Sequence, residues 1–524
     1  MSVNTIQNLL ERAACVEPDK VWLIDGNERY TYLEFKERVD KIAQYLTTLG
    51  YPKGSRIGIY SNKSSYQVIA ILALLSTEYL FVPITRLLKP NQVKHIIDDC
   101  NISCIITDST KIESIKAIDF KGKIISYEST DQSDVSFEEI YKFYDGDIST
   151  ELHGHDNACI TYSFGSLGNP RGIVIDNRAL IDGARIVANY LGIRKGDVIS
   201  GLLSFNLDYG LNQIFATLYR RATLVIHRFA LASDFFTHII NDKITILPLM
   251  PIHITQMFDI DQHRIPQPEH FKNLHTITSS GGNVTTSMIE KIEEYFPHSK
   301  FYAMHGLTEA FRSSYLDPAQ LSKRPTSIGK AIPDVELYII NEDGYECKAG
   351  ETGELIHRGA CIYRGYWNDP KESEKRFKSI SILDNIIKPE GQLRDEIVIA
   401  SGDYVKRDED GYMYFVSRKD DMIKTRGYRV SPYEIERVIE NNLSQIDSCA
   451  VFAIPNEDIE EEIVLIYSAK TELAKNEILF EMKRHLPNYM LPEQIIYRKI
   501  LPFKSLHEKE IDREELKREF LLNC

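Results

Sequence analysis

Apolar and polar residues follow two different periods along this chain. Between Tyr30 and Gly50, apolar residues recur every three or four positions and the stretch ends at a glycine, which predicts an amphipathic helix. Short β-branched runs alternate with further helical stretches, and the clearest strand candidates are 56–60, 80–84, 102–107, 123–125 and 223–226. Strands that alternate with helices predict parallel sheets with helices on their faces, and therefore an α/β fold.

The pattern changes beyond about residue 322. Short alternating strands with turn signals, such as 336–340 and 354–357, predict a β-rich subdomain over about 322–418. The last hundred residues return to alternation, with a helix at 432–442, a strand at 449–453 and a helix near 475–486. Because the charged string SRKDD separates two apolar segments, we expect a large N-terminal domain (1–418) and a small, mobile α+β C-terminal domain (421–524).

Composition narrows the class of ligand. The formal net charge of -14 over 524 residues argues against general electrostatic binding of nucleic acid or anionic lipid, although a local basic groove can still bind phosphates. The eight cysteines lack zinc spacing, which favours reduced thiols. Residues 1–19 lack the basic region, apolar block and small-residue cleavage site of an export signal, so we expect no export. The most apolar stretch, 68–75, is too short to cross a membrane and predicts a buried helix. We therefore expect a cytoplasmic protein with a small ligand.

The segment ITYSFGSLGNPRGIVI, at 160–175, combines glycines, hydroxyls and one cation between two β-rich runs. Glycines let the backbone direct N–H groups toward an anion, and hydroxyls and a guanidinium add to its binding. It is not a Walker A loop, because the glycine-lysine-serine/threonine ending is absent. The sequence leaves open a phosphate-binding loop or a surface turn; the residues concerned are Ser163, Gly165, Ser166, Gly168, Arg171 and Gly172.

Two later stretches carry oxygen ligands. In YAMHGLTEAFRSS, Thr308 and Glu309 follow a glycine turn, and magnesium on phosphates takes one or two such oxygens. In SGDYVKRDEDGYMYFVSRKDD, Asp403 is expected at a strand end and Arg418 after the YMYFV strand. A carboxylate at a strand end suits the paired hydroxyls of a ribose, whereas the alternative is an aspartate that only caps a turn.

The order of these motifs resembles the adenylate-forming, or AMP-binding, superfamily of acyl-CoA synthetases, peptide-synthetase adenylation domains and luciferases. YTYLEF, YSFGSLGNPRG, HGLTE and GELIHRGACIYRGYWNDP look like successive landmarks of that family. The most specific block is SGDYVKRDEDGYMYFVSRKDDMIKTRGYRVSPYEIE, at 401–436. The resemblance covers nearly the whole chain and implies an ATP- and Mg²⁺-dependent ligase.

The resemblance assigns roles to individual residues. Ser163, Gly165, Ser166, Gly168 and Arg171 would hold the β- and γ-phosphates, Thr308 the α-phosphate and Glu309 the Mg²⁺. The adenine and ribose would be bound by Ser280, Gly281, Gly282, Asn283, His305, Gly306, Asp403 and Arg418. Asp420 matches the hinge of the C-terminal domain, and Gly427 would line the pantetheine channel.

The chain departs from the family at several of these positions. Leu167 stands where a hydroxyl residue is common, Arg171 replaces a lysine, and His305 replaces a tyrosine. The C-terminal lysine of the family falls in LPFKSLHEKEIDREEL, where either Lys509 or Glu510 matches its position. We favour Lys509 as the catalytic residue, because a carboxylate beside the reacting anions would oppose the charge that develops.

The acid substrate is expected between the stretch LLSFNLDYGLNQIF, residues 248–253 and 278–280, and the turn at 304–313. The pocket residues singled out are Asp208, Tyr209, Met304 and Arg312. By resemblance Asp208 would bind a substrate ammonium, and the alternatives are a helix N-cap or a structural ion pair. Arg312 either pairs with a second carboxylate of the substrate or is a solvated surface residue. A small polar acid or amino acid is favoured over a long-chain fatty acid.

The resemblance thus implies that a carboxylate and ATP give an acyl adenylate and pyrophosphate. The acyl group would then pass to a pantetheine thiol, either of CoA or of an acyl or peptidyl carrier protein. The alternative is a degenerate homologue that binds nucleotide with little or no ligase activity, motivated by Leu167, Arg171 and the irregular lysine region. Nothing in the sequence selects the acid, the thiol acceptor, the oligomeric state or the pathway.

Overall fold

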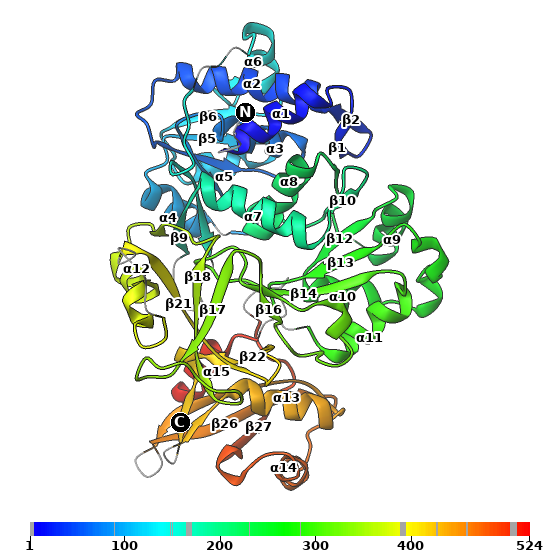
Figure 1. The fold of residues 1–524 in the computed structure, drawn as a ribbon, viewed down its shortest axis with the longest axis vertical. Helices are drawn as coiled ribbons and strands as arrows, with labels where there is room; N and C mark the ends of the chain where they lie inside the picture. Colours follow the sequence, from blue (N-terminus) through cyan, green and yellow to red (C-terminus); the bar gives the residue numbers. More distant parts are fainter. Residues whose placement is uncertain are drawn as a thin grey trace.

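The chain folds into four β-sheets with helices packed on them (Figure 1). The structure is a computed structural model that describes residues 5–88, 90–146, 148, 150–163, 170–229, 231–282, 284–387, 395–425, 428–456, 460–503 and 511–523. Two large sheets form the N-terminal part, and most strands of the two smaller sheets come later in the sequence. This mixed architecture confirms the α/β fold that the sequence predicts.

Among the described residues, the first large sheet has nine strands. Its central strands run parallel, and antiparallel pairs close both edges. In spatial order the strands are β16 (Lys330–Ala331), β15 (Ser314–Tyr315), β14 (Lys300–His305), β13 (Thr276–Ser279), β12 (Ile246–Leu249), β10 (Val198–Gly201), β11 (Thr223–Ile226), β1 (Val21–Asp25) and β2 (Glu28–Thr31).

The second large sheet has eight strands within the described ranges, and most of its pairs are also parallel. The antiparallel hairpin of β8 and β9 flanks the segment expected to bind phosphates. The order is β19 (Gly365–Tyr366), β9 (Arg171–Asp176), β8 (Asn157–Ser163), β4 (Leu80–Pro83), β3 (Arg56–Tyr60), β5 (Cys104–Thr107), β6 (Lys123–Ser126) and β7 (Val135–Ser136).

Helices cover both sheets, and their ends follow local sequence signals. The helix expected within 30–50 begins at Tyr32, because Thr31 and Glu34 form a reciprocal capping box, and Gly50 follows it with a φ of 66°. The helices of this part are α1 (Ile6–Val16), α2 (Tyr32–Thr48), α3 (Ser65–Leu74), α4 (Pro90–Cys100), α5 (Ile112–Ala117), α6 (Phe137–Phe143), α7 (Asn177–Tyr190), α8 (Asp208–Arg220), α9 (Ala232–Asn241), α10 (Pro251–Phe258), α11 (Thr286–Tyr295) and α12 (Pro370–Arg376).

The most apolar stretch is buried, as expected: every residue of α3 except Tyr66 is buried. α7 and α8 pack against each other and contribute to the largest hydrophobic core. In the part of the chain that the structure describes, no helix combines the length and apolar character needed to cross a membrane.

The third sheet corresponds to the expected β-rich subdomain and lies between the large part and the C-terminal part (Figure 1). Its strands are antiparallel: β17 (Val335–Ile340), β18 (Thr352–Gly359), β21 (Ile397–Arg407), β20 (Phe377–Ser379) and β22 (Met413–Arg418). Asp403 was expected at a strand end, and this was wrong. β21 continues to Arg407 because β22 pairs with it along that length, so Asp403 lies inside the strand.

The fourth sheet is built from β24 (Tyr428–Val430), β23 (Ile423–Thr425), β26 (Glu460–Ala469), β25 (Ile446–Asn456) and β27 (Gln494–Tyr497). The helices α13 (Pro432–Asn442), α14 (Lys475–Lys483) and α15 (Arg513–Asn523) complete this part. Two hydrophobic cores are formed entirely from residues after 420, one centred on Ile435 and Leu465 and the other on Ile466 and Leu516. The domain limits at 418 and 421 stay a prediction.

One buried histidine makes the stability of the β-rich subdomain depend on pH. Burial lowers the pKa of His357 to about 4, so the neutral ring is favoured in the folded state. The unfolded chain takes up the proton near pH 6.5. Because of this difference in proton uptake, the free energy of unfolding should fall by about 2 kcal/mol when the pH is lowered from 7 to 5.

Denaturant unfolding of the native chain and of His357→Gln at both pH values checks this expectation. The native chain should lose more stability on acidification than the variant, whatever the offset between them at pH 7. Parallel pH profiles for the two proteins would contradict it.

Candidate active site

Asp403 and His305 form a buried polar pair where the first and third sheets meet. Asp403 is 1% exposed and pairs directly with Arg418 across β21 and β22, with 2.9 Å between Arg418 Nε and Asp403 Oδ1. His305, at the end of β14, places Nε2 3.3 Å from Asp403 Oδ2. Burial opposes ionisation, but His305 and Arg418 hold the pKa of Asp403 below its ordinary value. A carboxylate is therefore kept charged in a buried position.

Both carboxylate oxygens of Asp403, and Nε2 of His305, are buried and have no hydrogen bond of good geometry. A buried polar atom without such a bond costs free energy, about 1–3 kcal/mol in typical proteins. Ligand hydroxyls would satisfy these atoms. The residues present therefore fit the paired hydroxyls of a ribose.

Glu309 is the second buried carboxylate of this region, and it is 5% exposed. The Tyr366 hydroxyl donates to Glu309 Oε1 at 2.6 Å, and Arg376 Nε lies 3.7 Å from the same oxygen. Burial raises the pKa of Glu309, while Tyr366 and Arg376 act in the opposite direction. A divalent cation beside this carboxylate would favour its charged form, so Glu309 fits a single oxygen ligand of Mg²⁺.

Arg376 connects the two carboxylates in space. A Cβ on Gly402 would lie 1.7 Å from Arg376 Nη1, so a side chain before Asp403 would displace the guanidinium from this position. Gly402 also has a φ of 70°, which favours glycine. Arg376 and Arg418 each act on the charge of both Glu309 and Asp403. Residues from four distant parts of the sequence thus converge on one region.

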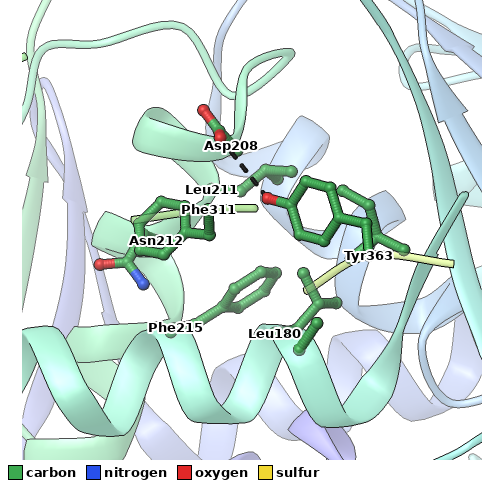
Figure 2. A pocket seen from close by; sticks show the side chains of 10 residues that line it. Leu180, Asp208, Leu211, Asn212, Phe215, Phe311 and Tyr363 are labelled. Carbon is green, nitrogen blue, oxygen red and sulfur yellow. Dashed lines mark hydrogen bonds between the residues drawn. The ribbon is translucent and has the colours of Figure 1, made fainter. Parts of the chain in front are cut away.

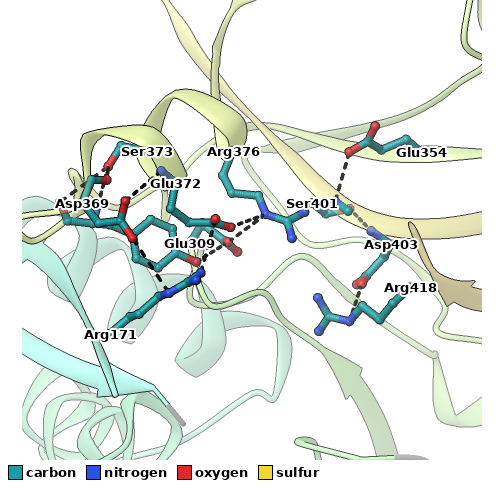
Figure 3. A network of polar contacts seen from close by, with 12 residues as sticks. Arg171, Glu309, Glu354, Asp369, Glu372, Ser373, Arg376, Ser401, Asp403 and Arg418 are labelled. Atoms are coloured by element: carbon teal, nitrogen blue, oxygen red, sulfur yellow. Dashed lines mark hydrogen bonds and ion pairs between the residues drawn. The ribbon is translucent and has the colours of Figure 1, made fainter. Parts of the chain in front are cut away.

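Arg171 lies at the start of β9 and faces α12 (Figure 3). Its Nη1 is 3.2 Å from Glu372 Oε2, and its Nε is 3.8 Å from Asp369 Oδ2. Glu372 also pairs with Arg376 Nε at 3.3 Å. Charges of alternating sign therefore run Arg171, Glu372, Arg376, Glu309 (Figure 3). In this arrangement the expected phosphate-binding guanidinium is engaged by carboxylates.

In the turn after β14, the backbone at Gly306 lies close to the backbone at Phe311. A Cβ on Gly306 would lie 2.6 Å from the carbonyl oxygen of Phe311, so a side chain there would displace the turn. Thr308 is exposed at its tip, while Glu309 points inward. Ser280 and Gly282 follow β13, the neighbouring strand, and Ser280 is buried.

Several expected site residues lie outside the described residues. They are Gly165, Ser166, Leu167 and Gly168 of the phosphate segment, Asn283, Gly427, and both Lys509 and Glu510. For Ser163, in β8, and Asp420, in the short 3₁₀ turn Lys419–Asp421, the backbone is described and the side chain is not. Their roles stay predictions.

Asp208 is the first residue of α8 and lines a small cavity between α7 and α8 (Figure 2). The N-cap is Leu207, so a capping role for Asp208 was wrong. Asp208 Oδ1 accepts from the Tyr209 N–H at 2.6 Å, and the Tyr363 hydroxyl lies 3.5 Å from Oδ2. Burial raises the pKa of Asp208, while Arg312 opposes that rise.

The cavity below Asp208 is about 10 Å³, close to the volume needed for one water molecule. Apolar side chains line most of it, among them Leu180, Phe215 and Phe311 (Figure 2). This arrangement has no room for a long acyl chain at that position.

Arg312 is buried, at 2% exposure, so its interpretation as a solvated residue was wrong. Nη1 donates to Ser280 Oγ, and the guanidinium lies over the rings of Tyr209 and Phe311, 4.9 Å from each centroid. Its Nε is buried without a hydrogen-bond partner. Among the described residues, no carboxylate lies within ion-pair distance of Arg312. A buried cation without an anionic partner is costly unless a ligand supplies one.

The remaining pocket residues surround this guanidinium. The hydroxyls of Tyr209 and Thr278 are hydrogen-bonded at 2.6 Å. Met304 is buried in β14, and the Tyr190 hydroxyl lies 2.9 Å from its sulfur. The structure therefore brings Tyr209, Met304 and Arg312 to one region beside Ser280.

Three residues of the region were not singled out from the sequence. Tyr366 and Tyr363 lie within the GELIHRGACIYRGYWNDP motif, whose match to the family was the signal available for both. Arg376 follows that motif in α12, and no pattern marked it among the neighbouring charged residues. Its contact with Glu309 depends on the packing of α12 against β21.

Comparison with known proteins gives a match to one sequence family. The sequence pattern of the AMP-binding enzyme family matches residues 10–367. Tyrocidine synthase 1 of Brevibacillus parabrevis is 26% identical over 98% of this chain and 45% of its own length. The chain thus spans less than half of that curated relative.

Solved structures share the fold. ATP-bound MatB from Rhodopseudomonas palustris superposes with a TM-score of 0.85, at 20% identity, over 99% of both chains. O-succinylbenzoate coenzyme A synthetase (MenE) from Bacillus subtilis, in complex with ATP and magnesium, superposes with a TM-score of 0.82, at 20% identity, over 97% of this chain and 99% of its own. At these identities the likeness shows the fold alone.

Proposed function

The chain belongs to the AMP-binding enzyme family, and from that premise we propose that it activates a small carboxylic acid with ATP and then transfers the acyl group to a thiol. The observation that carries the proposal is the buried Asp403 carboxylate, whose two oxygens have no hydrogen bond of good geometry while His305 and Arg418 keep it charged. A buried site of that kind fits a sugar diol beside an anionic nucleotide. Glu309 and Arg376 lie in the same region.

In the proposed first step the substrate carboxylate attacks the α-phosphorus in line, and pyrophosphate leaves. Asp403, Arg418 and His305 orient the ribose, and the segment from Ser163 to Arg171 holds the β- and γ-phosphates. Thr308 and Lys509 donate to the oxygens on which negative charge develops. Mg²⁺, held by Glu309, would supply electrostatic stabilisation of the phosphates.

In the proposed second step a pantetheine thiol replaces AMP on the acyl group. MenE is by its name a coenzyme A synthetase, so CoA is one acceptor to be tested, and a carrier protein is the other. Rotation of the C-terminal part about Asp420 would admit the thiol past Gly427.

We propose that the acid is small and polar, and that an amino acid or an acid with a second anionic group fits best. The unpaired, buried Arg312 supports a carboxylate partner, and the half-buried Asp208 supports an ammonium partner. The small cavity beside Asp208 disfavours a long chain there. Both charged groups lie at the same end of α8, next to Tyr209.

The decisive experiment is acid-dependent ATP–pyrophosphate exchange across a panel of amino acids, dicarboxylates, aromatic acids and fatty acids. For the best acid, Arg312→Met should lower kcat/KM on the order of 10²-fold, because the variant removes the charge-assisted bond to the substrate while keeping an unbranched side chain. The KM for ATP should change little. The matched control is Arg484→Met, at an exposed arginine of the C-terminal part.

An unchanged kcat/KM in Arg312→Met, with the control also unchanged, would contradict the role of Arg312. A thioester assay with CoA, and with a phosphopantetheinylated carrier protein, then identifies the acceptor. A fatty acid as the best substrate would contradict the substrate class but not the reaction.

A second candidate function, nucleotide binding without ligation, is favoured by the pairing of Arg171 with Glu372 and Asp369. A guanidinium held by two carboxylates is less available to pyrophosphate. ATP binding measured by calorimetry, together with no exchange for any acid of the panel, would support this second function over the first.

A further inference from the structure

A basic cleft lies at the opposite end of α8 from Asp208. Its volume is about 380 Å³, and its walls come from α1, the connection after α7, and the last turn of α8. α1 packs against both α7 and α8 at this place. Because α8 has 13 residues, roughly 20 Å of helix separates the cleft from Asp208. The cleft is therefore distinct from the candidate active site.

Five cationic side chains line this cleft, although the chain as a whole carries a net charge of -14. They are Arg12, Arg194, Lys195, Arg220 and Arg221. Within the described residues, Glu17 is the only carboxylate in ion-pair contact with any of them, 2.5 Å from Lys195 and 4.0 Å from Arg221. One carboxylate leaves a large local excess of positive charge.

The guanidinium groups of the cleft retain unused donors. Nε of Arg220 and Nε of Arg221 are buried without a hydrogen-bond partner. Arg12 and Arg194 are exposed, and neither side chain forms an ion pair with another described residue. Exposed guanidinium groups such as those of Arg12 and Arg194 are donors that bind phosphates in proteins.

Part of this charge has a local explanation. Arg220 lies in the last turn of α8 and Arg221 is its C-cap residue, and cations at this end of a helix interact favourably with the helix dipole. That explanation does not extend to Arg12, which lies on α1, or to Arg194, which lies in the connection before β10. Three separate segments therefore contribute cations to one cleft.

We propose that this cleft binds a small, multiply charged anion that bears phosphate groups. Its volume lies at the lower end of the range for small-molecule sites, and its enclosure by three segments favours a free ligand over a macromolecular surface. The proposal does not depend on which acid the active site takes, or on whether the site turns over.

Titration calorimetry with sodium tripolyphosphate tests the proposal. Three proteins are compared: the native chain, the double variant R12Q/R194Q, and the control R484Q/R518Q, which removes two exposed arginines of the C-terminal part. The active site is the same in all three proteins, so a difference in tripolyphosphate affinity between them is caused by the substitutions in the cleft. The affinity should fall by about tenfold or more in R12Q/R194Q, because two charge-assisted contacts are lost, and stay unchanged in the control.

The variant R12K/R194K keeps both positive charges and therefore distinguishes the loss of charge from damage to the fold. It should keep most of the affinity for tripolyphosphate. Pyrophosphate exchange and thermal midpoint should be unchanged in both cleft variants. Equal affinity in the native chain and R12Q/R194Q would overturn the proposal. So would an equal loss in R12K/R194K, or binding to phosphatidylserine vesicles that requires Arg12 and Arg194 without any such requirement for tripolyphosphate.

Discussion

Replacing Glu309 by glutamine is expected to lower acid-dependent pyrophosphate exchange on the order of 10²-fold, because the neutral amide binds Mg²⁺ far more weakly than a carboxylate. The amide has the same shape and can still accept from the Tyr366 hydroxyl, which lies 2.6 Å from Oε1. The fold should therefore be kept. Exchange measured over a range of Mg²⁺ concentrations should show a higher metal requirement in the variant.

Glu354→Gln is the matched control for this change. Glu354 accepts from the Gly402 N–H at 3.1 Å and pairs with Lys419 at 2.7 Å, so it is a half-buried carboxylate near the site that does not face Glu309. Its replacement should leave the metal requirement as it is. Equal exchange in Glu309→Gln and the native chain would remove Glu309 from the metal site.

Lys509→Ala is expected to lower adenylate formation by about 10²- to 10³-fold, and far more than Glu510→Ala does. The reason is electrostatic: a lysine beside the α-phosphate and the substrate carboxylate offsets the charge that develops there, whereas a glutamate would increase it. Single-turnover formation of the adenylate from ATP and the preferred acid measures this step directly.

The second half-reaction provides the internal control for Lys509. Supplied with synthetic acyl adenylate, Lys509→Ala should form thioester at a rate near that of the native chain, because the lysine is expected to act in adenylation. A larger effect of Glu510→Ala on adenylation would show that the register of LPFKSLHEKEIDREEL is shifted by one residue from the one favoured here.

Local patterns predicted most of the fold. The strand at 56–60 and the helix at 432–442 were confirmed with the same limits, because the first is a short run that contains two isoleucines and ends at a tyrosine, and the second begins at a serine cap followed by proline. The predicted limits of strands were less accurate where they depend on hydrogen bonding to a neighbouring strand. The strand expected at 102–107 begins at Cys104, where its pairing with β3 starts.

The candidate site was predictable only in part. Motif order indicated Glu309, Asp403 and Arg418, and the structure brings them together, whereas Arg376 reaches Glu309 only through the packing of α12 on β21. Burial of Arg312 also depends on tertiary contacts, since the sequence around it, AFRSS, has no periodicity that distinguishes an inward arginine from a solvated one. The assignments at Gly165, Gly168 and Lys509 stay predictions.

The row of alternating charges from Arg171 to Glu309 has a consequence for how nucleotide and metal bind. A triphosphate that attracted Arg171 would leave Glu372 with Arg376 as its main partner, and Arg376 would then hold Glu309 less tightly. Glu309 would become more available to a cation. We therefore expect positive cooperativity between the two ligands, and by linkage each would raise the affinity for the other by the same factor.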